Sequence, residues 1–313
     1  MLMRYLSLLL FGLLALRGWA GEPSVLLAAV GDVMIARTVP QRIAAHGAAW
    51  AWEGIAPELR RADLRFCNLE CTVSRGGLKV PKVYSFRADP ELAAAVLTAG
   101  RFDIASLANN HTWDYGRSAL GDTMAEMEAL HIAAPGAGTG RAGAIAPRIV
   151  ACNGLRIAFV AYTWWVPEGY LPADDAPALA TLDETTLAEE LKAAKAGADL
   201  LIVSIHWGTE YAAAPTPGQQ RVARLAIDAG ADLILGHHPH VAQPIEIYKD
   251  RPILYSLGNC LFDKSGNHES TGLLALIRLS KGRVTVERQV RLKIKDARPE
   301  KGSVPFMVPI SGD

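Results

Sequence analysis

The chain has 313 residues and half of them are hydrophobic, which is enough to bury the core of one large domain or two small ones. Its 32 Lys and Arg residues balance its 32 Asp and Glu residues. This balance, with no long basic run, argues against a nucleic-acid partner, although a net count does not exclude local charged patches.

The first 20 residues have the pattern of a secretion signal. Arg4 precedes an apolar run over residues 6–16, and small residues around Ala20 suit a cleavage site. Arg17 is unusual in such a signal, so an uncleaved N-terminal anchor is the alternative, although the run is short for a membrane span. We therefore expect an exported protein, periplasmic or extracellular, either released or anchored through its N-terminus.

Apolar runs that end in polar side chains recur along the chain and predict buried strands. These runs and their polar ends are residues 24–30 before Asp32, 63–67 before Glu70, 102–107 before Asn109, Asn110, His111 and Asp114, 199–204 before His206, and 232–235 before the histidines at 237, 238 and 240. Helical patterns separate most of them, at residues 57–61, 90–99, 116–130, 183–196 and 217–229. This alternation predicts an α/β fold.

The C-terminal part predicts a different kind of pairing. Residues 252–256 predict one more strand, and residues 273–279 and 284–294 predict an antiparallel hairpin that turns near Gly282. Residues 133–148 are rich in Gly, Ala and Pro and predict a loop. From residue 296 onward the chain shows no clear pattern, and we expect a tail.

The turn over residues 236–240 is the most informative stretch, because it holds three of the 8 histidines. Pro239 favours an extended conformation at His238, so that His238 and His240 would project from one turn toward one cation. Neutral imidazole is the commonest protein ligand of zinc-class metals.

The other polar strand ends can complete a metal site. The carboxyl ends of parallel strands meet at one edge of a sheet, where two carboxylates, an amide and several histidines would converge. Mixed oxygen and nitrogen ligands suit Mn, Zn or Fe and do not suit a calcium site. A carboxylate able to bridge indicates one or two divalent transition-metal ions.

The loop over residues 75–88 carries four basic side chains. It is either a solvated loop or a clamp for an anionic substrate. Arg87 beside Phe86 is the best candidate for such a clamp, with Lys79 as a second basic residue. The four cysteines, Cys67, Cys71, Cys152 and Cys260, are read as small core residues, with a disulfide of unspecified pairing as the alternative.

Taken together, the motifs resemble those of the CapA family of bacterial capsule (poly-γ-glutamate) proteins. The motifs that carry the resemblance are Gly31-Asp32, Asn68-Leu69-Glu70, Asn109-Asn110-His111, His206-Trp207-Gly208, Gly236-His237-His238-Pro239-His240 and Ser256-Leu257-Gly258-Asn259. Their order is similar to that of calcineurin-like metallophosphoesterases and covers roughly residues 25–265. The resemblance implies a four-layer αββα sandwich, here as a single domain over residues 24–295.

The resemblance also implies roles for single residues. Asp32 and His240 would bind the first metal and Glu70 would bridge, whereas Asn110, His206 and His238 would bind the second. His111 would act as general acid or stabilise developing charge, oriented by Asp114. His237 would lie either behind the metal ligands or against the substrate, and Trp207 would contact the substrate.

Two positions depart from the metallophosphoesterase pattern. Met34 stands where a metal-binding histidine is usual, and a thioether is a poor ligand for these cations. The bridging residue is Glu70 rather than Asp. Two functions follow: an exported metal-dependent hydrolase of an anionic envelope polymer or a phosphoester, or a non-catalytic accessory protein that binds capsule polymer. Either function could involve membrane proteins of capsule synthesis as partners.

Overall fold

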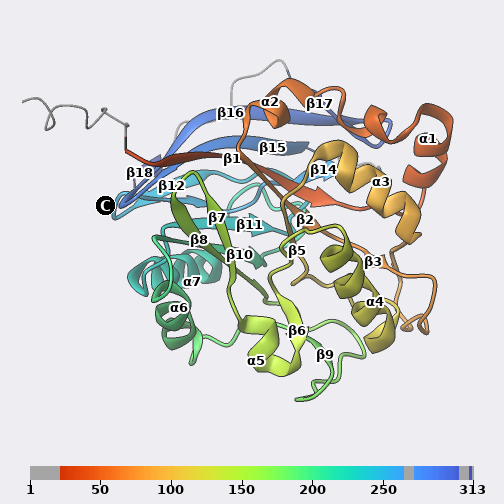
Figure 1. The fold of residues 1–313 in the computed structure, drawn as a ribbon, viewed down its shortest axis with the longest axis horizontal. Helices are drawn as coiled ribbons and strands as arrows, with labels where there is room; N and C mark the ends of the chain where they lie inside the picture. The colour runs from red at the N-terminus through yellow and green to blue at the C-terminus, as the bar shows by residue number, and fades with distance from the viewer. Residues whose placement is uncertain (1–21, 264–270, 303–309, 312–313) are drawn as a thin grey trace, which may run out of the picture.

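Two β-sheets pack face to face between two layers of helices (Figure 1). The structure is a computed structural model that describes residues 22–263, 271–302 and 310–311, and within these ranges each sheet has 7 strands. The predicted secretion signal at residues 1–20 lies outside the described residues. Among the helices in the described ranges, none has the length and apolar character needed to cross a bilayer.

The first sheet carries the strand ends with the two carboxylates. Its central strand β1 (Ser24–Val33) runs parallel to β2 (Leu64–Leu69) and antiparallel to β15 (Thr271–Ser280). In spatial order the strands are β17 (Arg298–Lys301), β16 (Arg283–Lys295), β15, β1, β2 and β5 (Ile104–Ser106), and β14 (Asn259–Leu261) pairs with the end of β1.

The second sheet carries the histidines. Four of its strands run parallel, and the register places His206 of one strand beside His237 of the next. In spatial order the strands are β18 (Ile310–Ser311), β12 (Ile245–Tyr248), β13 (Arg251–Leu254), β11 (Leu233–His237), β10 (Leu200–His206), β8 (Leu155–Thr163) and β7 (Arg148–Cys152).

Helices cover the outer face of each sheet. Those on the first sheet are α1 (Val39–His46), the 3-10 helix η1 (Ala48–Trp52), α2 (Ala56–Arg61), α3 (Pro90–Gly100) and α4 (Gly116–Ala129). Those on the second are α5 (Gly140–Ile145), α6 (Leu187–Lys195) and α7 (Pro217–Asp228). Two short pairs lie outside the sheets: β3 (Thr72–Val73) with β4 (Arg87–Ala88), and β6 (Ala137–Thr139) with β9 (Pro177–Leu179).

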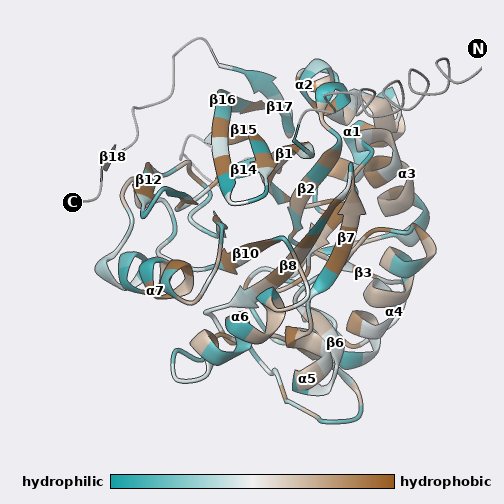
Figure 2. Ribbon diagram, turned by 60° about the vertical axis from the view of Figure 1, so that its left-hand side comes forward, coloured by the Kyte–Doolittle hydropathy of each residue, from teal (hydrophilic) through white to brown (hydrophobic). Residues whose placement is uncertain are grey.

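Strand β1 shows how the layers are filled. Val25 and Leu27 belong to the core between the two sheets, whereas Leu26 and Ala28 belong to the core under the helices. Successive side chains of a strand point to opposite faces, so a continuous apolar run is what a sheet covered on both faces requires. Figure 2 shows brown, hydrophobic stretches along β8 and β10 and teal, hydrophilic residues on α2. The predicted αββα sandwich is confirmed.

The structure corrects some predicted elements. Residues 298–301, expected in a tail, form β17 by pairing with the edge of β16. Residues 137–145, expected in a loop, form β6 and α5. These three short elements form because they pair with or pack against other parts of the chain. Their own sequences have no regular hydrophobic pattern. Cys67, Cys71 and Cys260 are buried, and within the described residues all four cysteines are free thiols.

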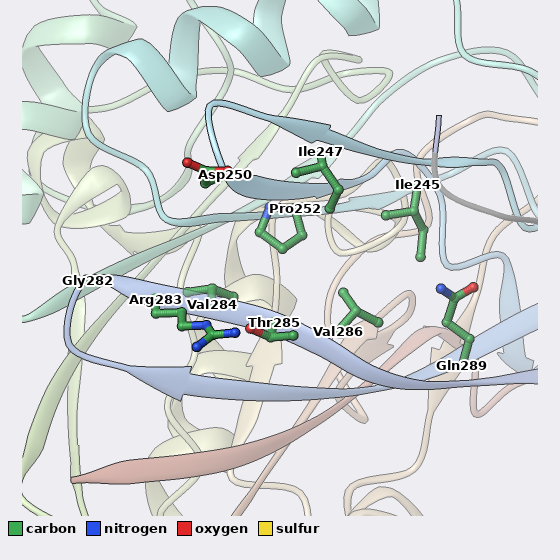
Figure 3. Close-up of a pocket in the computed structure, with 10 residues that line it drawn as sticks. All are labelled: Ile245, Ile247, Asp250, Pro252, Gly282, Arg283, Val284, Thr285, Val286 and Gln289. Atoms are coloured by element: carbon green, nitrogen blue, oxygen red, sulfur yellow. The ribbon is translucent and has the colours of Figure 1, made fainter. Parts of the chain in front are cut away.

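A pocket of about 520 Å³ opens where the β15–β16 turn faces β12 and β13. Figure 3 shows Ile247 of β12 on one wall and Val286 of β16 on the other. Beside this turn, Ser280 pairs with Ser24, the first residue of β1, whereas Asp32 lies near the last. The pocket is therefore at the opposite end of the strand from the polar residues.

Candidate metal centre

The polar strand ends of both sheets meet at one edge of the sandwich. Parallel pairing of β1 and β2 aligns Asp32 with Asn68. The Nδ2 of Asn68 donates to Asp32 Oδ1 at 2.9 Å and lies 3.5 Å from His206 Nδ1 of the second sheet. Asn68 thus joins the carboxylate side of the site to the histidine side.

Three residues form what we call the inner cluster: Asp32, Glu70 and His206. One ligand atom of each lies within 4.8 Å of the others, and all three side chains are buried. The Oδ1 of Asn110 lies 3.0 Å from His206 Nε2. Four residues expected as metal ligands are therefore brought together from four separate segments of the chain.

Three more residues form what we call the outer cluster: Glu210, His238 and His240. Their ligand atoms also lie within 4.8 Å of one another. The outer cluster adjoins the inner one, because His240 Nδ1 lies 3.5 Å from Asp32 Oδ2 and His240 Nε2 lies 3.8 Å from Glu70 Oε1.

Unpaired buried atoms test whether these residues suit a cation. Among the described residues, Asp32 Oδ2, Glu70 Oε1 and His238 Nδ1 are buried and accept or donate no hydrogen bond. Each such atom costs about 1–3 kcal/mol if it stays unpaired. Carboxylate oxygen and imidazole nitrogen are ligands of Mn, Fe and Zn, so the donor set fits a divalent transition metal.

The charges of the carboxylates are unequal. Burial works against ionised Asp32, but contacts with His237 and His240 outweigh it and hold the pKa of Asp32 well below its usual value. Burial and the neighbouring Asp32 raise the pKa of Glu70 well above its usual value. A cation beside Glu70 would favour its carboxylate form.

Two histidines of the site, His206 and His238, are held neutral. Burial, and then repulsion from His238, lowers the pKa of His206 well below its usual value. Burial and repulsion from His240 lower the pKa of His238 to about 3. His240 is the exception, because its contacts with Asp32 outweigh burial and raise its pKa. At neutral pH, His206 and His238 are thus already in the form that binds metal.

The histidine turn is strained. His238 has φ of 96°, so the extended conformation expected before Pro239 is wrong, and His240 has φ of 58°. Both values lie in the region that side chains with a Cβ rarely adopt. Backbone hydrogen bonds hold the turn against the loop after β10, from Trp207 N to His237 O at 3.0 Å and from Tyr211 N to Pro239 O at 2.8 Å. Such strain persists where the surrounding structure enforces it, and it is concentrated at functional sites.

His111 and Asp114 form a hydrogen-bonded pair beside the clusters. His111 Nδ1 lies 2.8 Å from Asp114 Oδ2, which also accepts from Phe86 N at 2.6 Å. The Phe86 ring stacks on the His111 ring at 4.0 Å. Since Asp114 holds Nδ1, Nε2 is the ring nitrogen left for proton transfer. Burial lowers the pKa of His111, despite the opposing effect of Asp114.

Trp207, expected to contact substrate, and His237, expected either behind the metal ligands or against the substrate, are both enclosed by the protein. His237 is fully buried, 3.5 Å from Asp32 and stacked on Phe66, so it supports Asp32 from behind. Trp207 is also fully buried, and its Nε1 donates to Tyr255 O at 2.9 Å. Neither side chain has a face open to a substrate.

The basic loop contributes a different residue from the one expected. Arg87 is exposed and lies over the Tyr115 ring at 4.2 Å, and Lys79 is exposed on the same loop. Lys82 reaches the site instead. Its Nζ donates to Asp114 Oδ1 at 2.7 Å and to Asn110 O at 2.9 Å, and its side chain is only 6% exposed.

The chain is similar to known proteins over most of its length. The model of the bacterial capsule synthesis protein family PGA_cap matches residues 26–264. The chain is 31% identical over 279 residues to capsule biosynthesis protein CapA of Bacillus anthracis, which covers 87% of this chain and 68% of that protein. It is 32% identical over 275 residues to PGA biosynthesis protein CapA of Bacillus subtilis, which covers 86% of this chain and 72% of that protein.

Two solved structures share the fold at low sequence identity. A 5'-nucleotidase precursor from Thermus thermophilus has a TM-score of 0.51 at 13% identity, covering 88% of this chain and 56% of that one. The NAD nucleotidase NadN of Haemophilus influenzae has a TM-score of 0.50 at 14% identity, and the match covers 93% of this chain and 61% of that one. The chain thus spans less than two thirds of either protein, and the likeness concerns the metallophosphoesterase-type fold alone. On the family match and the curated relatives, this chain belongs to the CapA (PGA_cap) family of bacterial capsule synthesis proteins.

Proposed function

We propose that the chain is an exported, metal-dependent hydrolase that cleaves an anionic cell-envelope polymer of the poly-γ-glutamate type or a phosphoester. The observation that carries this proposal is the His111–Asp114 pair, fixed at 2.8 Å beside buried metal-binding groups. A protein that only binds polymer has no physical need for an oriented proton-transfer pair. The names of the two Bacillus relatives support a capsule or PGA context.

The metal ligands would come from both sheets. Divalent cations there would act as Lewis acids toward a carbonyl or phosphoryl oxygen and make water a better nucleophile at neutral pH. The residues that would hold them are Asp32, Glu70, Asn110, His206, His238 and His240.

The chain's own residues would handle the protons. Burial keeps His111 largely neutral, so its Nε2 can accept a proton from the attacking water and pass it to the leaving amine or alkoxide. Asp114 fixes the ring through Nδ1, and Lys82 and the Phe86 amide hold Asp114 in place.

One observation favours a second candidate, a non-catalytic accessory protein that binds polymer and works with membrane proteins of capsule synthesis. Met34 is fully buried, and its sulfur accepts from Ala36 N at 3.1 Å. This side chain adds no ligand where a histidine is usual, which weakens one half of the site.

A paired assay separates the two candidates. Purified protein supplied with Mn²⁺ or Zn²⁺ is assayed on poly-γ-glutamate and on a phosphodiester, and its metal content is measured. We expect turnover of one substrate, and we expect His111→Asn to keep its metal but lose at least about 100-fold in kcat. His131→Asn, at an exposed histidine outside the site, serves as the control.

One result would contradict the hydrolase, and another would contradict the role of His111. Protein that retains metal but turns over neither substrate would support the accessory role. Full activity in His111→Asn would remove His111 from the reaction.

A further inference from the structure

We propose that Glu210 is a metal ligand, completing with His238 and His240 a solvent-facing cation site that Glu70 joins to the inner cluster. This inference rests on the metal-binding part of the proposed function and does not depend on hydrolysis. None of the motif roles implied by the family resemblance includes Glu210.

The loop after β10 brings Glu210 to the histidine turn. The chain bends at Gly208, which has φ of 86°. A Cβ there would lie 2.7 Å from the Gln219 amide oxygen, so this bend needs glycine. The hydrogen bond from Tyr211 N to Pro239 O then fixes the segment next to Glu210 against the turn. As a result, ligand atoms of Glu210, His238 and His240 lie within 4.8 Å of one another.

Two histidines alone do not make up the three or four protein ligands of a zinc-class cation. His240 Nδ1 is 2.9 Å from Asn259 Oδ1, which leaves Nε2 as its ligand atom, 3.8 Å from the unpaired Glu70 Oε1. His238 is 7% exposed, and its Nδ1 has no hydrogen bond within the described structure. These buried groups alone offer two imidazoles and one shared carboxylate.

Glu210 supplies what the site lacks. Zinc-class cations take three or four protein ligands, and His238, His240, Glu70 and Glu210 make four. Met34 adds no ligand on the inner side of the centre, whereas Glu210 would add a carboxylate ligand and a negative charge on the outer side. Because Glu210 is exposed whereas both histidines are buried, it would form the wall of the site that faces solvent.

The test measures metal binding rather than activity. Metal-free full-length protein is titrated with Zn²⁺ or Mn²⁺ by calorimetry, with bound metal checked by equilibrium dialysis and elemental analysis. We expect two ions in the wild type. In Glu210→Gln, which keeps the size but removes the charge, one ion stays and the other loses at least about tenfold in affinity.

Two further variants serve as controls for this measurement. Glu189→Gln, an exposed glutamate on α6, should bind both ions as the wild type does. Glu210→Asp should recover part of the lost affinity, because it retains a carboxylate. Glu210→Gln with wild-type stoichiometry and affinities would overturn the proposal, as would a wild type that binds one ion or none.

The outcome is separable from that of the hydrolase proposal. A wild type that binds two ions, loses one in Glu210→Gln and yet turns over neither substrate would refute hydrolysis and leave this site standing.

Discussion

At the scale of single residues, Lys82 is the least expected part of the site. It is a nearly buried lysine that donates to Asp114 and to the backbone of Asn110, and it lies 3.4 Å from Glu168 on the loop after β8. One ammonium group therefore connects the basic loop, the His111–Asp114 pair and a third segment. This arrangement suits a positioning residue rather than a substrate clamp.

Lys82→Met should lower kcat by about tenfold or more while metal content stays unchanged, because Asp114 loses the donor to Oδ1 and orients His111 less firmly. Lys79→Met, on the exposed part of the same loop, is the matched control and should keep wild-type kcat. The measurement is steady-state kinetics with elemental analysis of each variant. If the two variants have the same kcat, Lys82 does not position the pair.

The sequence could predict the ligands on strands better than the residues on loops. Asp32 and His206 follow continuous apolar runs, and such a run specifies a strand end, so their convergence could be predicted. A loop has no such period, and nothing in residues 75–88 indicates that Lys82 turns inward while Arg87 turns toward Tyr115. Glu210 could be recognised as a candidate metal ligand only once the bend of the chain at Gly208 was known.

At the scale of elements, the parallel strands of the second sheet set the position of the histidine turn. Gly236 of β11 lies directly against Tyr255, the residue after β13, so a Cβ at Gly236 would overlap the Tyr255 carbonyl and lie 2.7 Å from Trp207 Nε1. Trp207 itself donates to that carbonyl. The fully buried Trp207 is thus part of the packing that brings β11 close to its neighbour.

Gly236→Ala should destabilise the protein by about 1–3 kcal/mol, because rigid backbone surrounds the added methyl group. The shifted turn should also weaken metal binding. Gly197→Ala is the control, since a Cβ there meets no atom within 4 Å and should change stability by less than about 0.5 kcal/mol. Urea unfolding of the metal-free proteins measures both values, and equal stabilities would show that β11 can move away from Tyr255.

The elements that sequence patterns could predict are those with a strong hydrophobic period. The hairpin of β15 and β16 is one, and α7, with its capping box at Thr216 and Gln219, is another. Strand β17 is the opposite case. Its sequence Arg-Pro-Glu-Lys has no strand propensity, and it is ordered by the edge of β16. Pairing with a neighbouring strand of this kind leaves no pattern in the sequence of the short strand itself.

At the scale of the whole molecule, the candidate metal centre joins the two sheets. Asp32 and Glu70 come from the first sheet, and His206 and His238 come from the second or the turn that follows it. In metal-free protein the contacts across this edge leave several buried atoms unpaired, at about 1–3 kcal/mol each. A cation held by both sheets would satisfy these atoms and cross-link the layers.

Metal should therefore stabilise the entire sandwich and not only the turn. At a free Mn²⁺ or Zn²⁺ concentration of 100 times Kd, linkage predicts a gain of about 2.7 kcal/mol for one site, which corresponds to a rise in Tm of several degrees. Differential scanning calorimetry should show one transition that moves upward as a whole. Ca²⁺, a poor partner for imidazole, should move it much less. A Tm that rises equally with Ca²⁺ would indicate non-specific binding to carboxylates, and a Tm that no divalent metal changes would contradict a cation shared between the sheets.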